Sequence, residues 1–140
     1  MLSKKVSRVS KIRNKIMKTI LVFDRYPNML DAFERFLSQE NYRVLTTDTL
    51  EEAFGIINVV KVDLMIMDTE KNSDELILKT EKIIREKSLT PPILLTATYG
   101  DTLTAKAARE LGAADIILKP FDPKDMKRVI RELIKKNNLN

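Results

Sequence analysis

Cysteine and histidine are both absent from the 140 residues of this chain. Without cysteine, neither a disulfide framework nor a thiolate metal site can form, which fits a reducing compartment. Without histidine, serine-histidine triads, imidazole zinc sites and histidine general bases are excluded. Any chemistry must therefore come from Asp, Glu, Lys, Thr or Tyr side chains.

Long apolar runs are missing as well. No stretch approaches the roughly 20 apolar residues that cross a bilayer, and the N-terminus lacks the apolar core of a secretory signal, so we expect a cytoplasmic protein without a membrane span. Only three glycines are present, and none lies in the loop directly after the first expected strand. This excludes a glycine-rich loop there for flavin or dinucleotide phosphates. With 44% hydrophobic and 32% charged residues, the composition fits one globular domain.

The net charge of +5 belongs to the N-terminal end of the chain. Residues 1–18 hold seven basic residues and no acid, which leaves 18 basic and 20 acidic residues in the remainder. Apolar residues recur there at spacings of three and four, so residues 1–17 could form an amphipathic helix that docks on a partner, on the domain itself, on an anionic membrane or on nucleic acid. The alternative is a poorly ordered extension. We place the folded domain at residues 18–138.

Strand-like apolar runs alternate with helical periodicity from Thr19 onward. Each expected strand is followed by an expected helix, and the third and fourth helices should cover about 72–84 and 101 or 102 to 111. Thr49 and Glu52 match a capping box, Gly112 suits a helix end, and Asp122-Pro123 suits a helix start. The expected strands lie within 20–23, 43–46, 62–68, 93–96 and 115–118.

Five strand-helix units predict an α/β fold of the flavodoxin-like (βα)5 type. The natural strand order is 2-1-3-4-5, in one parallel sheet with helices on both faces. In that order, four polar residues at the carboxyl ends of different strands should meet at one edge of the sheet. These residues are Asp24, Asp68, Thr96 and Lys119.

Phosphoryl acceptance by Asp68 is the chemistry that these four side chains support. A carboxylate can take a phosphoryl group when a cation neutralises the charge and the reacting atoms are held in line. Lys119 would supply the cation, Asp24 would help to hold a divalent metal, and the Thr96 hydroxyl would donate to a phosphoryl oxygen. Each residue also has a purely structural interpretation: a turn or helix cap for the two acids, an ion-pair partner for Lys119, and a strand end for Thr96.

The chain resembles the receiver domains of two-component response regulators over about residues 18–137. The motifs that carry the resemblance are Ile20-Leu21-Val22-Phe23-Asp24, Asp63-Leu64-Met65-Ile66-Met67-Asp68, Leu95-Thr96-Ala97, Gly112-Ala113-Ala114-Asp115 and Lys119-Pro120-Phe121. The resemblance implies a CheY-like domain that is not an enzyme. It also implies phosphorylation of Asp68 by a histidine kinase or phosphotransfer protein, and Mg²⁺ as cofactor. The resemblance further implies an output surface on helix 4, strand 5 and helix 5, a cis Lys119-Pro120 bond and the possibility of a dimer.

Departures from the family pattern concentrate around the metal site. Receivers usually place two adjacent acids after the first strand, but here the second position is Arg25. A guanidinium there would repel Mg²⁺ and could pair with Asp68, so we expect weak or absent metal binding. Glu70 stands where the family supplies a backbone carbonyl ligand, and its side chain is a candidate to replace part of the lost acid. The aromatic switch residue of the fifth strand is replaced by Ile116.

Two functional hypotheses remain open at this point. The first is a stand-alone response regulator without a DNA-binding domain, phosphorylated on Asp68 and signalling through protein contacts. The second is a degenerate receiver in which Arg25 imitates the metal and the domain acts as a phosphorylation-independent interaction module. A phosphatase of the haloacid dehalogenase type would need Asp-x-Asp after a strand, which neither acidic position provides. Under either hypothesis, the basic outer side of the last helix is expected to meet an acidic or protein partner.

Overall fold

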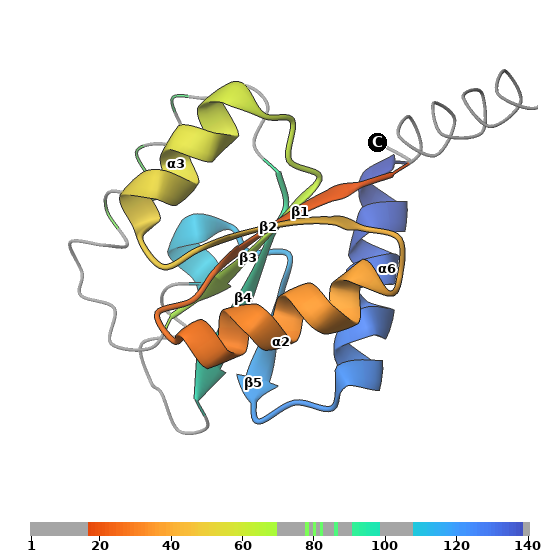
Figure 1. The fold of residues 1–140 in the computed structure, drawn as a ribbon. Coiled ribbons are helices and arrows are strands. Elements are labelled where there is room, and N and C mark those ends of the chain that lie inside the picture. The colour runs from red at the N-terminus through yellow and green to blue at the C-terminus, as the bar shows by residue number, and fades with distance from the viewer. Residues whose placement is uncertain are drawn as a thin grey trace, which may run out of the picture.

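Five parallel strands form the centre of the molecule (Figure 1). The computed structural model describes residues 17–69, 91–98 and 108–138 and the single positions 78, 80, 82 and 86. The sheet order is β2-β1-β3-β4-β5 and every neighbouring pair is parallel, which confirms the fold predicted from the sequence. The strands are β1 (Thr19–Phe23), β2 (Arg43–Thr47), β3 (Leu64–Asp68), β4 (Ile93–Thr98) and β5 (Asp115–Lys119).

Helices pack on both faces of this sheet. The helices α2 (Pro27–Ser38) and α6 (Pro123–Asn138) cover one face, whereas α3 (Leu50–Val59) covers the other (Figure 1). Residues 108–111 are also helical and lie on the α3 side. Three predicted segments fall outside the described residues. They are the N-terminal extension apart from Met17, most of the third predicted helix, and the start of the fourth. None of the described helices is long and apolar enough to cross a membrane.

Local capping signals set several helix ends. Thr49 accepts a hydrogen bond from the Glu52 N–H at 3.3 Å and thereby starts α3, which is one half of the predicted capping box. The Thr49 N–H donates to Thr47 Oγ1 at 3.2 Å. Asp122 accepts from the Lys124 N–H at 2.9 Å at the start of α6. Gly112 has a φ of +62°, a left-handed conformation that glycine adopts without a steric penalty, and the chain turns there into β5.

The core has two layers, one on each face of the sheet. Leu64 and Ile66 pack toward α2 and α6, whereas Met65 and Met67 pack toward α3, because successive side chains of a strand point to opposite faces. All four are almost fully buried, as expected for a strand inside a parallel sheet. Burying each such side chain stabilises the fold by about 1.5–3 kcal/mol. The carboxyl ends of the strands are therefore held rigidly.

Candidate functional site: a buried acidic cluster at the carboxyl edge of the sheet

The pleat of the sheet places the four predicted polar residues on one face. Asp68 follows Ile66 by two residues, so it continues the layer that faces α2 and α6. Asp68 and Thr96 are register partners on β3 and β4, and Asp24 follows Phe23, the partner of Met67. The four side chains therefore share the edge and face that strand order and alternation require.

Lys119 links the two carboxylates. Its Nζ atom lies 2.7 Å from Asp24 Oδ2 and 3.4 Å from Asp68 Oδ1. Lys119 pairs in register with Thr98, two residues beyond Thr96, so its side chain extends back over the edge to reach the acids. Both carboxylates are completely buried. We call Asp24, Asp68 and Lys119 the acceptor cluster, and its formal charge is −1.

The lysine of the acceptor cluster stays protonated at neutral pH. Burial lowers the pKa of Lys119, but the hydrogen bond to Asp24 and the charges of Asp68 and Asp24 together outweigh it, so the pKa lies above its ordinary value. The ammonium is therefore a fixed positive charge beside the Asp68 carboxylate. A group that arrives at Asp68 with negative charge would meet this cation.

Asp24 also organises the turn between β1 and α2. Its Oδ1 atom accepts a hydrogen bond from the Tyr26 N–H at 2.9 Å, and the Lys119 ammonium lies 5.9 Å from the centroid of the Tyr26 ring. The helix-cap interpretation of Asp24 does not describe its position, because the N-cap residue of α2 is Tyr26. Tyr26 was not among the predicted site residues, although an aromatic residue two positions after Asp24 was visible in the sequence.

Two threonines fix the end of β4 next to Asp68. The Thr69 N–H and Oγ1 both donate to the Thr96 carbonyl oxygen, at 2.9 and 2.8 Å. The Thr96 hydroxyl is buried and has no hydrogen-bond partner among the described residues. An unsatisfied buried hydroxyl costs about 1–3 kcal/mol, so the binding of a group that accepts its hydrogen bond would be favourable there. Sequence reasoning missed Thr69, whose only signal is a hydroxyl side chain directly after Asp68.

The residues that depart from the receiver pattern lie in different surroundings. Arg25 is partly buried in the turn that follows Asp24. Ile116 packs against the core layer on the α3 side, opposite the face that carries the acceptor cluster. Glu70 lies outside the described residues. Among the residues that the structure describes, no group of three or more acids, histidines or cysteines gathers as a metal site.

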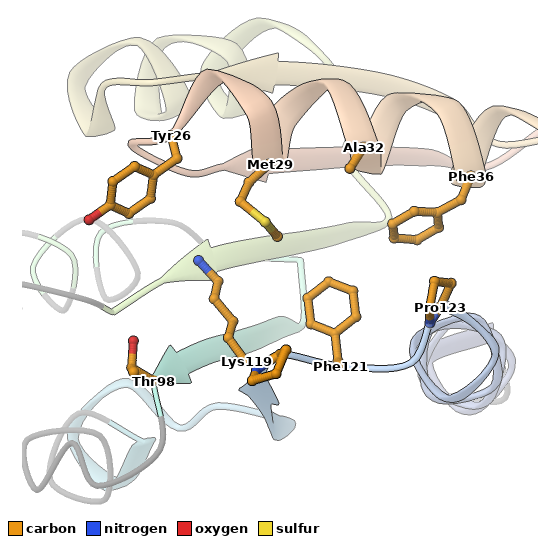
Figure 2. A pocket seen from close by; sticks show the side chains of 9 residues that line it. Tyr26, Met29, Ala32, Phe36, Thr98, Lys119, Phe121 and Pro123 are labelled. Atoms are coloured by element: carbon orange, nitrogen blue, oxygen red, sulfur yellow. The ribbon is translucent and has the colours of Figure 1, made fainter.

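An apolar groove of about 570 Å³ opens beside the acceptor cluster (Figure 2). One wall comes from α2 and the turn before it, and the other from the end of β4, the end of β5 and the segment that leads into α6. Phe121 packs against Phe33 and Phe36 with ring-centroid distances of 5.5 and 6.3 Å. The Lys119-Pro120 peptide bond, which precedes Phe121, is cis, as the resemblance implies. The lining residues are Tyr26, Met29, Ala32, Phe36, Thr98, Lys119, Pro120, Phe121 and Pro123.

Comparison with known families identifies the class of domain. The sequence model of the response regulator receiver domain matches residues 20–131, so the chain belongs to the response regulator receiver domain family. The transcriptional regulatory protein YvrH of Bacillus subtilis is 32% identical over 119 residues, which cover 84% of this chain and 49% of that protein. The heme response regulator HssR of Staphylococcus saprophyticus is 29% identical over 128 residues, 89% of this chain and 54% of that protein.

Solved structures agree with this assignment at the level of the fold. A CheY-like receiver domain protein from Methanospirillum hungatei superposes with a TM-score of 0.77 at 23% identity, covering 87% of this chain and 97% of that chain. A response regulator from Thermotoga maritima gives 0.75 at 22% identity, with 86% and 99% covered. The chain spans about half the length of the curated relatives that it matches.

Proposed function

We propose that this receiver domain accepts a phosphoryl group on Asp68 and transmits the signal through protein contacts. The observation that carries the proposal is the fully buried Asp68 carboxylate at the carboxyl edge of the sheet, with the Lys119 ammonium 3.4 Å away. Carboxylates are expensive to bury, and a fully buried acid beside a fixed cation at the carboxyl edge of a parallel sheet is a candidate for a reactive group. The donor would be a histidine kinase or a phosphotransfer protein.

The transfer follows from the groups at the site. One oxygen of Asp68 attacks the phosphorus atom of a phosphohistidine on the donor. A phosphorus–oxygen bond forms while the phosphorus–nitrogen bond breaks, and the electron pair leaves with the imidazole nitrogen. Lys119 would then neutralise charge on the phosphoryl oxygens, and the Thr96 hydroxyl would donate to one of them.

The groove beside the site suits the approach of a phosphodonor. Lys119 lines the groove and also contacts Asp68, so a protein that delivers a phosphoryl group to Asp68 must cover part of this surface. Met29, Phe36 and Phe121 would receive apolar side chains of that protein. We place the output partner on the surface of β5 and α6, where Leu118 is 44% exposed.

Magnesium is the cofactor that receiver domains typically use, and only part of its usual ligand set is present here. Asp24 and Asp68 would hold the ion, since Mg²⁺ commonly takes one or two protein carboxylates. However, the Lys119 ammonium already contacts both acids, and the residue after Asp24 is the cation Arg25. Asp24, Asp68, Lys119 and Arg25 together carry no net charge, so we expect weaker Mg²⁺ binding than a second acid at position 25 would give.

The proposal is tested by phosphorylating the protein with phosphoramidate, with and without Mg²⁺, and measuring the intact mass. We expect the mass of one phosphoryl group on the wild-type chain and none on Asp68→Asn. Asp31→Asn, which changes an exposed acid of α2, is the matched control and should be labelled like the wild type. Equal labelling of Asp68→Asn and the wild type would contradict the proposal.

A second candidate function is favoured by Arg25 and Ile116. These residues replace a metal ligand and the switch aromatic of the family, as expected of a domain that binds its partner whether or not it is phosphorylated. Arg25→Asp distinguishes the two candidates. If Arg25 limits phosphorylation, the variant should bind Mg²⁺ more tightly and label faster, as followed by NMR shifts and intact mass. Tight Mg²⁺ binding and rapid labelling of the unmodified protein would remove the second candidate.

A further inference from the structure

Tyr26 contacts the acceptor cluster in two separate ways. Its N–H donates to Asp24 Oδ1 at 2.9 Å, and the Lys119 ammonium lies over its ring, with Nζ 5.9 Å from the ring centroid. Lys119 in turn donates to Asp24 Oδ2 at 2.7 Å. One residue therefore contacts both the carboxylate and the cation of the closest pair in the cluster.

Helix α2 fixes the backbone of Tyr26. Tyr26 is the N-cap residue of this helix, and its carbonyl oxygen accepts hydrogen bonds from the Met29 and Leu30 N–H groups at 3.0 and 3.2 Å. Pro27 follows at the first helical position, where its fixed φ favours the start of a helix. The side chain of Tyr26 makes no capping hydrogen bond to α2. A substitution at position 26 should therefore keep the backbone contact to Asp24 and remove only the ring.

The Tyr26 ring lies where the acceptor cluster meets the apolar groove. Tyr26 and Lys119 both line the groove, and the Lys119 side chain extends toward the turn that carries Tyr26 (Figure 2). Tyr26 is 40% exposed, whereas the Lys119 side chain is only 13% exposed. An aromatic ring attracts a cation over its face more strongly when the cation is shielded from water. The burial of Lys119 therefore favours a contact of measurable strength.

Two carboxylates attract the same ammonium. The Nζ atom lies 2.7 Å from Asp24 Oδ2 and 3.4 Å from Asp68 Oδ1, so its closer contact is not with the acceptor. Because the stem of a lysine side chain is flexible, an ammonium held at one carboxylate can still swing about that contact. The ring adds another attractive surface and narrows the range of positions. A cation that is already in place when charge develops on the phosphoryl oxygens needs no reorganisation at that moment.

We propose that Tyr26 is a positioning residue, whose ring holds the Lys119 ammonium beside Asp68 for phosphoryl transfer. The inference rests on the proposed function, in which Lys119 neutralises charge on the phosphoryl oxygens. Transfer to Asp68 should therefore slow when the ring is removed. The loss should depend on the electron density of the ring face and not on the hydroxyl group.

The experiment follows the initial rate at which phosphoramidate labels the full chain, by intact mass at one fixed Mg²⁺ concentration. We expect Tyr26→Leu to be labelled at least about threefold more slowly than the wild type, whereas Tyr26→Phe keeps the ring and should stay within about twofold. Tyr42→Leu makes the same change in a partly buried tyrosine directly before β2, at the opposite edge of the sheet. This matched control should also stay within about twofold of the wild type.

Ring fluorination separates electrostatic attraction from packing. Replacing Tyr26 by phenylalanine with one, two or three ring fluorines keeps the shape of the ring nearly unchanged but withdraws electrons from its face. The labelling rate should fall stepwise along this series and approach that of Tyr26→Leu. Urea unfolding of every variant shows whether the fold is intact, and the fluorinated series still decides if Tyr26→Leu fails to fold.

An NMR measurement tests the contact without any phosphorylation. Protons over the face of an aromatic ring are shifted upfield, so the ε-methylene protons of Lys119 should move downfield in Tyr26→Leu. They should keep their shift in Tyr26→Phe. The signal is assigned by its disappearance in Lys119→Arg.

Three labelling results would overturn the proposal. These are a wild-type rate in Tyr26→Leu, equal losses in Tyr26→Leu and either Tyr26→Phe or Tyr42→Leu, and a flat fluorinated series. An unchanged Lys119 shift in Tyr26→Leu would contradict the contact itself. Absence of labelling in the wild type would instead contradict the proposed function, and the Lys119 shift would then decide whether the ring holds the ammonium.

Discussion

Two charge clusters in this molecule have the same layout with opposite signs and opposite surroundings. In the acceptor cluster, the single cation Lys119 lies between two acids, and the three side chains are at most 13% exposed. In the second cluster, the carboxylate of Glu40, which follows the end of α2, lies 3.5 Å from Lys127 and 3.7 Å from Arg131 of α6. These side chains are 22% to 67% exposed.

The comparison indicates that burial, more than the number of charges, sets how strongly the stability of the fold depends on an ion cluster. Around Glu40, water screens the charges, so the cluster ties α2 to α6 weakly and can be altered at little cost. In the acceptor cluster, the charges are largely desolvated, and removing the central cation takes away a charge that both carboxylates contact. Of these two clusters, the buried one at the carboxyl edge of the sheet therefore depends more strongly on its charges.

Lys119→Met should have the largest effect on stability. The change leaves Asp24 and Asp68 buried without their cation, and we expect unfolding in urea at neutral pH to require about 3–5 kcal/mol less free energy. A loss below about 1 kcal/mol at neutral pH would show that the cluster is effectively solvated.

Asp68→Asn should have the next largest effect, in the opposite direction. The change removes one of two buried negative charges and leaves the neutral pair of Asp24 and Lys119, which are 2.7 Å apart. We expect the unfolding free energy to rise by about 1 kcal/mol, as is common when a functional charge is removed. Asp24→Asn is the matched comparison and should destabilise, since it weakens the shorter contact and the turn at Tyr26. A destabilised Asp68→Asn would mean that Asp68 is a structural residue.

Glu40→Gln should change the unfolding free energy by less than about 1 kcal/mol, and the difference should vanish in high salt. The same urea titrations measure it. An effect as large as that of Lys119→Met would contradict the contrast between the two clusters.

Alkaline pH should affect both clusters slightly and with the same sign. Burial raises the pKa of Tyr42, the Arg131 charge lowers it and Glu40 raises it, and the net direction is upward. The pKa of Lys119 is raised as well. A group whose pKa is higher in the folded protein than in the unfolded chain stabilises the fold. This contribution is fully present at pH values below the unfolded pKa, which is about 10 for Tyr and 10.4 for Lys. That stability is lost as the pH rises through the folded values.

Urea midpoints measured from pH 9 upward should therefore fall, and Tyr42→Phe should make the decline shallower. An unchanged decline in Tyr42→Phe would show that the surroundings of the Tyr42 ring do not affect its titration.

Most of the fold could be predicted from the sequence. Apolar runs such as Leu64–Met67 define strands, and five strand-helix units leave few possible sheet orders, so the edge shared by Asp24 and Asp68 follows from topology alone. Thr49 and Gly112 mark helix ends because capping depends on local chemistry.

Contacts that depend on side-chain reach across the fold were not predictable. The sequence did not indicate that Lys119 lies closer to Asp24 than to Asp68, because that depends on how far one side chain extends over a twisted sheet. The double donation from Thr69 to Thr96 and the packing of Phe121 against α2 also require the folded geometry. The roles assigned to Arg25, Glu70 and Ile116 stay predictions.

The most direct test of the central claim is to locate the phosphoryl group within the acceptor cluster. An acyl phosphate on aspartate can be reduced by borohydride to homoserine, and peptide mass spectrometry then identifies the position. After treatment with phosphoramidate, we expect homoserine at position 68 and unmodified aspartate at position 24, with no reduction in untreated protein. Homoserine at position 24, or at neither position, would contradict the claim that Asp68 is the acceptor.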